Sequence, residues 1–404
     1  MRRVWVLAGV AFLLICPGAS AEVELGQVTN SHAFGSTFGV NCSFNQIPGA
    51  GNCEESEVRQ PAAVVATGGR YYVLEYSAFV QDPRNRIAVF AGDGTFLGAF
   101  GSPGPGLGSL GASYDLVLGK DSRLYAAESG NTRIQSFAAD LAAPSPSILT
   151  TLPWSPYAID SGPDGELALT SSLGEIVKLD TSGMPVFEEG FPGGLFPQDV
   201  AVAPDGDVWF AVGDPDNRIH HLSPSGQHLG SFGVPGEAEG QLHQPESLDI
   251  DSRGFLYITE WDLNHGWRIS RFTPDGKFTG VLPTPALAGY SVKGVAVDAN
   301  DNVLAVVNSF PSDYSVIRYT SRYVRLAKKP KPRTRARKAT FVFSSQLESP
   351  SYRCRLDKRK WSNCSKQKTW RRLSPGRHTA TVAVRESASS PWGPPTAFRW
   401  RVRR

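Results

Sequence analysis

The chain reads PQDVAVAPDGDVWFAVGDPDNRIHHLSPSGQHLGSFGVPGEAEGQLHQ from Pro197 to Gln244. Four short apolar runs in it (DVAVA, VWFAV, RIHHL and HLGSFG) are separated by Asp-Gly and Ser-Gly turn signals, which are typical of tight turns between antiparallel strands. The stretch therefore predicts a four-stranded antiparallel meander. A lone meander cannot bury both of its faces, so we expect it to stack on copies of itself.

The same plan recurs along the chain. The first strands of the units begin near Pro61, Ser113, Pro156, Pro197, Pro245 and Val292. Their spacing of about 40 to 50 residues is typical of a propeller or a repeat array. We therefore expect six units over residues 61–327.

The composition agrees with an all-β fold. The 404 residues include 41 Gly and 30 Pro, which favour many tight turns and oppose long helices. The length is sufficient for two or three domains.

Several runs carry a resemblance to NHL repeats. NRIAVFAGDGTFLGAFG from Asn85 and the NRIHHL run show an Asn-Arg-Ile start to the third strand, followed by a Gly-rich link; NTRIQSFAAD from Asn131 has a similar start. In NHL repeats an acidic residue also ends the second strand. The resemblance implies a six-bladed β-propeller. Units three and six depart from the pattern, because Glu175 and Val316 stand near the expected Arg positions.

The N-terminus has the features of an export signal. A basic start, an apolar run and small residues at Ala19 and Ala21 predict a secretory signal peptide over residues 1–21. A lipidated Cys16 is a second interpretation, which the bulky Ile15 before it disfavours. No later stretch is long enough to span a bilayer, so we expect a secreted protein without a transmembrane segment.

Residues 22–60 resemble the end of a repeat unit without its beginning. His32 to Gly39 is similar to a fourth strand and would complete the last blade of the ring; Arg322 to Leu326 is the alternative closing segment. Removal of the signal leaves four cysteines in two close pairs, and an even number outside the cytoplasm predicts disulfides. Three pairings are open, and we favour local ones: Cys42 with Cys53 and Cys354 with Cys364.

The composition changes after Ala327. Residues 328–338 form a basic, Pro-containing stretch that we expect to be an extended linker. Residues 339–404 contain short alternating strands, with Trp361 and Trp400 as expected core residues. This part resembles small immunoglobulin-like or fibronectin-III-like β-sandwich modules. From Lys328 onward, 22 Lys and Arg stand against three acidic residues, whereas the whole chain carries a net charge of +3. An acidic propeller is therefore predicted to carry a basic tail.

The start of each first strand predicts the binding site, because in a propeller these strands line the central channel. The expected ligand-binding residues at the channel mouth are Tyr114, Tyr157, Gln198, Glu246 and Lys293. The oxygen ligands of a calcium ion could come from Asp115, Asp199 and Glu246. The competing interpretation is that these groups bond neighbouring blades and channel water, and that Glu246 pairs with Lys293.

Other polar groups favour structural roles. Glu75, Glu128 and Glu260 end second strands ahead of Arg86, Arg133 and Arg268, which predicts ion pairs within each blade. The amidating lyase branch of the NHL families holds zinc with histidines, one of them in a Pro-His-Ser-Leu string; here that string is PESL, with Glu246 in place of the histidine, which disfavours that activity.

The function that these features favour is non-catalytic binding. We expect a propeller that recognises a protein, peptide or glycan without a cofactor. The basic module would attach to an anionic cell-envelope polymer rather than to nucleic acid. Its expected contact residues are Arg353, Arg355, Lys358, Arg359, Lys360, Arg371 and Arg372. The alternative is a calcium-dependent hydrolase similar to gluconolactonase and paraoxonase propellers, with the metal at the channel mouth.

Overall fold

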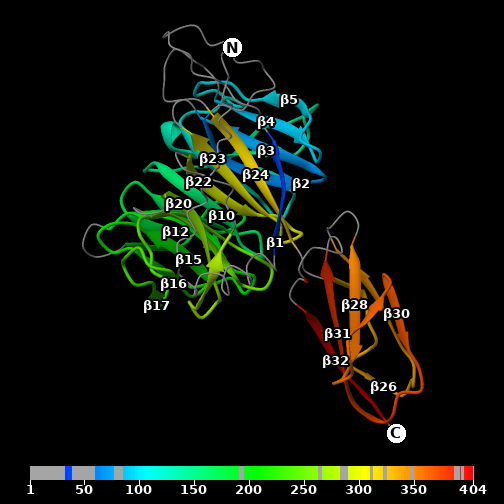
Figure 1. Ribbon diagram of the computed structural model, residues 1–404. Helices are drawn as coiled ribbons and strands as arrows, with labels where there is room; N and C mark the ends of the chain where they lie inside the picture. Colours follow the sequence, from blue (N-terminus) through cyan, green and yellow to red (C-terminus); the bar gives the residue numbers. More distant parts are fainter. Residues whose placement is uncertain are drawn as a thin grey trace, which may run out of the picture.

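The computed structural model is almost entirely built of β-strands (Figure 1). It describes residues 32–38, 60–76, 85–190, 195–262, 266–282, 290–309, 313–321, 325–345, 350–385, 392 and 395–403. The expected signal peptide and the segment with Cys42 and Cys53 lie outside these ranges.

Over the described part of residues 32–321, the strands form six four-stranded antiparallel sheets. The first contains β2 (Pro61–Thr67), β3 (Arg70–Glu75), β4 (Arg86–Ala91) and β5 (Phe96–Phe100); the second β6 (Ser113–Leu118), β7 (Arg123–Glu128), β8 (Arg133–Ala138) and β9 (Ser147–Thr151); the third β10 (Pro156–Ser161), β11 (Leu167–Ser171), β12 (Glu175–Leu179) and β13 (Pro185–Gly190). The fourth contains β14 (Pro197–Val202), β15 (Val208–Val212), β16 (Arg218–Leu222) and β17 (His228–Phe232); the fifth β18 (Pro245–Ile250), β19 (Leu256–Asp262), β20 (Gly266–Phe272) and β21 (Phe278–Val281); the sixth β22 (Tyr290–Val297), β23 (Val303–Ser309), β24 (Asp313–Ser321) and β1 (His32–Phe38).

The hydrophobic core lies between neighbouring sheets rather than at one centre. Each buried cluster joins two sheets: Phe100 of the first sheet packs with Leu116 of the second, for example, and Val64 of the first with Leu304 of the sixth. The first strands contact one another in a closed cycle, from β2 through β6, β10, β14, β18 and β22 back to β2. This arrangement buries both faces of every meander, which none could do alone.

The sixth sheet is completed by a strand from the other end of the chain. β1 pairs antiparallel with β24, from His32 opposite Ser321 to Phe38 opposite Val316. The alternative closing segment has a different place: β25 (Arg325–Lys328) pairs with β27 (Ala339–Ser344) in the C-terminal part. The ring is therefore closed by hydrogen bonds between the N-terminal strand and the last repeat unit.

The C-terminal residues form two sheets around one core (Figure 1). β25, β27 and β30 (Gln367–Trp370) make the smaller sheet; β26 (Arg333–Thr334), β32 (Thr396–Val402), β31 (Gly376–Arg385), β28 (Ser351–Leu356) and β29 (Ser362–Cys364) make the larger. Phe341 and Phe343 of the smaller sheet pack with Tyr352 and Trp400 of the larger. The Cys354–Cys364 disulfide joins β28 to β29.

Two expectations about this part need correction. The basic segment 328–338 is not an unpaired linker along its whole length, because β25 ends in it and Arg333–Thr334 pairs with β32. Trp400 is buried in the core as expected, whereas Trp361 lies outside the core cluster and contacts the side chains of Arg353 and Arg355.

Candidate functional site

A β-bulge lies near the start of the first strand in each of the six four-stranded sheets. The register shifts between Ser113 and Asp115 in β6, and between Pro245 and Ser247 in β18, so that the second residue of the strand has no partner on the neighbouring strand. A bulge of this kind re-aims a side chain relative to a regular strand. The bulge regions contain Ala62, Tyr114, Tyr157, Gln198, Glu246 and Lys293.

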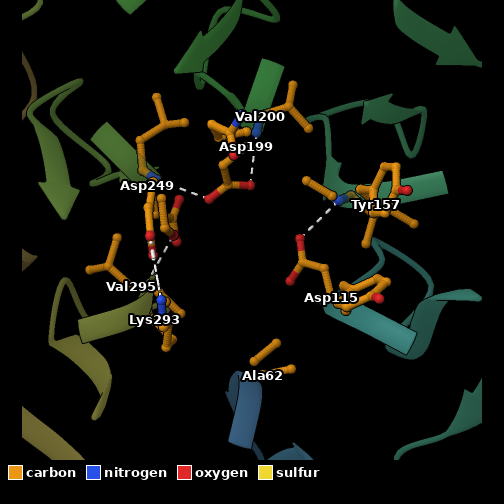
Figure 2. A pocket seen from close by; sticks show the side chains of 18 of the residues that line it. Ala62, Asp115, Tyr157, Asp199, Val200, Asp249, Lys293 and Val295 are labelled. Carbon is orange, nitrogen blue, oxygen red and sulfur yellow. Dashed lines mark hydrogen bonds and ion pairs between the residues drawn. The ribbon is translucent and has the colours of Figure 1, made fainter. Parts of the chain in front are cut away.

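All six of these residues line one cavity of about 780 Å³ at one end of the channel. Figure 2 shows how side chains from the first strands surround it. The five ligand-binding residues expected from the sequence are thus brought together from five different sheets. A second cavity, of about 550 Å³, shares Asp160 and Asp249 with the first and extends to the turn at Gly68 and Gly69.

Aromatic side chains form one side of the mouth. The ring of Tyr114 lies 5.0 Å from that of Tyr76 and 5.4 Å from that of Tyr157, measured between ring centres. Tyr114 and Tyr157 remain 40% and 41% exposed, and Phe196 on the rim is 54% exposed. Tyr76 and Phe196 were not predicted from the sequence, because Tyr76 follows the second strand β3 and Phe196 precedes the first strand β14.

Polar side chains form the other side of the mouth. Lys293 Nζ lies 3.2 Å from a carboxylate oxygen of Glu246 and 4.9 Å from the ring centre of Trp267. Burial raises the pKa of Glu246, and the nearby Lys293 ammonium opposes this rise. Gln198 Nε2 donates a hydrogen bond of 3.0 Å to the carbonyl of Phe196. The mouth therefore combines an aromatic arc with an ion pair and an amide.

Two of the expected metal ligands are engaged in contacts between sheets. Asp115 accepts the N–H groups of Leu116 and of Ile159 in the next sheet, both at 2.8 Å. Asp199 accepts those of Val200 at 2.8 Å and of Leu248 at 2.9 Å. Each carboxylate oxygen thus has a backbone donor, which is the structural role that the competing interpretation assigned to these groups.

Two further aspartates make the same kind of contact from positions two residues further along their first strands. Asp160 accepts the N–H of Val202 at 2.7 Å, and Asp249 accepts that of Val297. Burial raises the pKa of Asp160 to about 7 and that of Asp199 to about 6, although the backbone hydrogen bonds oppose the shift. Burial and neighbouring carboxylates also raise the pKa values of Asp115 and Asp249.

The three carboxylates expected to hold a metal differ in their contacts. Among the described residues, no group of three or more His, Cys, Asp and Glu side chains is placed to hold a metal ion. Asp115, Asp199 and Glu246 all line the cavity, but Glu246 pairs with Lys293 instead of joining the two aspartates.

The expected ion pairs within the sheets are confirmed. Arg133 Nε contacts a carboxylate oxygen of Glu128 at 3.0 Å, Arg268 Nε contacts Glu260 at 3.2 Å, and Arg86 pairs with Glu75. All three glutamates are buried. Because they lie in separate sheets, they tie second strands to third strands and do not converge on one substrate.

The basic residues expected to contact an anionic surface fall into two groups. Arg353 and Arg355 are half-buried on β28, beside tryptophan rings. The others are exposed in turns: Lys358, Arg359 and Lys360 follow β28, and Arg371 and Arg372 follow β30.

Comparison with solved structures shows β-propeller-like neighbours. Virginiamycin B lyase from Staphylococcus aureus is 18% identical, with a TM-score of 0.46 over 71% of this chain and 92% of that one. A putative gluconolactonase is 16% identical, with a TM-score of 0.48 over 72% and 91%. A protein of unknown function from Bacteroides thetaiotaomicron is 12% identical, with a TM-score of 0.52 over 70% and 74%.

No protein-family model and no curated protein matches the sequence. The described residues contain no helix that is long and apolar enough to cross a membrane.

Proposed function

We propose that the chain is an exported, non-catalytic binding scaffold. In this proposal a six-bladed, NHL-type propeller holds a protein, peptide or glycan ligand at its channel mouth. A basic immunoglobulin-like or fibronectin-III-like β-sandwich attaches it to an anionic surface of the cell envelope.

The observation that carries the proposal is the asymmetric lining of the mouth. The half-exposed rings of Tyr114 and Tyr157 offer apolar faces on one side, and the Glu246–Lys293 pair offers charges of both signs on the other. A concave site with a few polar groups opposite aromatic rings suits a ligand that has both apolar and hydrogen-bonding surfaces. A cavity of about 780 Å³ is large enough for a short glycan or a peptide end.

The engagement of the channel carboxylates also supports binding over catalysis. A general base or a metal ligand needs an available oxygen lone pair within reach of its target. In Asp115 and Asp199 each oxygen accepts a backbone N–H. One lone pair of each oxygen is therefore committed to a backbone donor, which leaves less of each carboxylate available for chemistry.

Binding at the mouth is tested by screening the purified protein on glycan and peptide arrays, followed by calorimetric titration of any hit. Tyr114→Ala should weaken binding by roughly tenfold, because it removes the middle ring of the aromatic arc. Leu229→Ala is a matched control, because Leu229 is exposed on the outer strand β17. Equal affinity in both variants would contradict the proposal.

The calcium-dependent hydrolase remains the alternative function. Elemental analysis of the dialysed protein, beside a Glu246→Ala variant, separates the two. One tightly held calcium or zinc ion per chain that is lost in the variant would support the hydrolase and direct the search to lactones and esters.

Attachment is tested by retention on isolated envelopes. Because β25 belongs to the C-terminal sheets, the chain is best truncated before Arg325. Retention should fall steeply with added salt and disappear on truncation. Retention that survives the truncation would contradict this part of the proposal.

A further inference from the structure

Three arginines and two tryptophans form an alternating stack on the larger C-terminal sheet. The guanidinium carbon of Arg353 lies 4.6 Å from the ring centre of Trp361 and 4.6 Å from that of Trp392. Arg355 lies 4.6 Å from Trp361, and Arg385 lies 4.4 Å from Trp392. We call these five residues the arginine ladder.

The ladder lies on the face of the sheet that points away from the core. Tyr352, Cys354 and Leu356 of β28 are in the core, so the alternating residues Arg353 and Arg355 point to the opposite face. Arg385 lies on the same face, because its neighbour Val384 is in the core. Further arginines on this face are Arg377 in β31 and Arg399 and Arg401 in β32.

Acidic partners do not neutralise the centre of the ladder. Within the described residues, no carboxylate lies within ion-pair distance of Arg353 or Arg355, and their buried Nε atoms have no hydrogen-bond partner. Asp357, the nearest acid along the strand, pairs with His378 at 3.0 Å. Burial lowers the pKa of Arg353, and the charges of Arg385 and Arg355 lower it further. An anion at the ladder would offset this repulsion.

The stacking also fixes the planes of the guanidinium groups. An indole ring next to a guanidinium holds it by a cation–π contact and restricts its rotation. The faces of Trp361 and Trp392 are engaged with arginines, so the polar edges of Arg353 and Arg355 remain for recognition. A planar carboxylate pairs with such an edge through two parallel hydrogen bonds.

We propose that the arginine ladder is a recognition site for the carboxylates of an acidic polysaccharide. This deepens the proposed attachment to an anionic surface and rests on it. The ladder supplies ordered, planar donors, whereas the exposed turn at Lys358–Lys360 supplies point charges that act at longer range.

Titration of the full-length protein with polygalacturonate, at about physiological salt, tests the assignment. Arg353→Lys keeps the positive charge but removes the planar guanidinium group. It should weaken binding by roughly tenfold. Lys366→Ala removes an exposed charge in the turn between β29 and β30, outside the ladder and the Lys358–Lys360 turn, and it should change the affinity by no more than about twofold. Arg355→Lys repeats the test at the end of the ladder if the first variant does not fold.

Four outcomes would overturn the ladder site. One is unchanged binding of Arg353→Lys in the folded protein. The second is a loss in Lys366→Ala as large as that in Arg353→Lys, which would indicate simple charge attraction. The third is tighter binding of polyphosphate or of anionic lipid vesicles than of polygalacturonate. If truncation before Arg325 abolishes envelope retention while Arg353→Lys keeps it, the attachment stands and the ladder assignment fails.

Discussion

The carboxylate of Asp160 in β10 accepts the backbone N–H of Val202 in β14 at 2.7 Å and joins two neighbouring sheets at the channel wall. Asp115, Asp199 and Asp249 make the same kind of contact at three other junctions. Together these four aspartates join the second sheet to the sixth in succession. The stability of the ring should therefore depend on their ionisation.

We expect the thermal stability of the protein to fall as the pH rises from about 5 to 8. Burial raises the folded-state pKa of Asp160 to about 7 and that of Asp199 to about 6. A raised pKa favours the protonated folded state, so its contribution is complete at low pH and is lost as the pH rises through these values. Melting temperatures measured across this pH range test whether stability falls as the pH rises.

Asp160→Asn should flatten this pH dependence, whatever the substitution costs at any one pH, because the amide does not ionise. Asp164→Asn is the control, since Asp164 is exposed and pairs with Lys120 at 3.5 Å on the surface. A wild-type protein whose stability rises with pH over this range would contradict the assignment.

Loss of the cation from the buried pair of Glu128 and Arg133 should cost far more than loss of a surface pair. Arg133 also donates to the carbonyls of Pro105, Gly106 and Ser109 and so anchors the Gly-rich link to the sheet. Arg133→Ala leaves the glutamate buried without its cation, which should cost about 3 to 5 kcal/mol in urea unfolding.

Lys120→Ala removes an exposed pair and should cost at most about 1 kcal/mol. Similar losses in the two variants would show that the arginine does not have this anchoring role.

The Cys354–Cys364 bond should stabilise the C-terminal sheets specifically. It closes a loop with a sequence separation of 10 residues. Loss of this constraint in Cys364→Ser should lower the free energy of unfolding of these sheets by about 2 to 3 kcal/mol. Tryptophan fluorescence can follow this transition, and the unfolding of the repeat sheets serves as the internal control. A shift of both transitions would argue against a local effect.

Removal of β1 should destabilise the ring and promote association. A chain that begins at Gln60 leaves the edge of β24 without its partner strand, and an unpaired edge is a site for pairing between molecules. Light scattering and thermal unfolding of this chain, compared with one that begins at His32, measure the effect. Equal behaviour of the two chains would show that β1 is dispensable for closure.

The positions of the repeat units followed from the sequence. Five first strands begin at the expected residues, from Pro61 to Pro245, and the sixth begins at Tyr290, two residues before the expected Val292. The Glu128–Arg133 type of pair was also predictable. These features depend on turns and on neighbouring strands, which are encoded within each unit.

Contacts between distant segments could not be read in this way. The residues expected at the start of the first strands were a good guide to the mouth, but Tyr76 joins it from the end of another strand. The inter-sheet role of Asp160 depends on which sheet becomes its neighbour, and the ladder depends on how Trp392 folds back onto β28.

The sequence of this protein thus determined the repeat, its period and the residues that begin each channel strand, because apolar runs and turn residues act over a few positions. The tertiary structure decided which strand closes the ring, which carboxylates are engaged by backbone N–H groups and which arginines stack on tryptophan. Those outcomes arise from packing between segments that are far apart in the chain, where no local pattern specifies the partner.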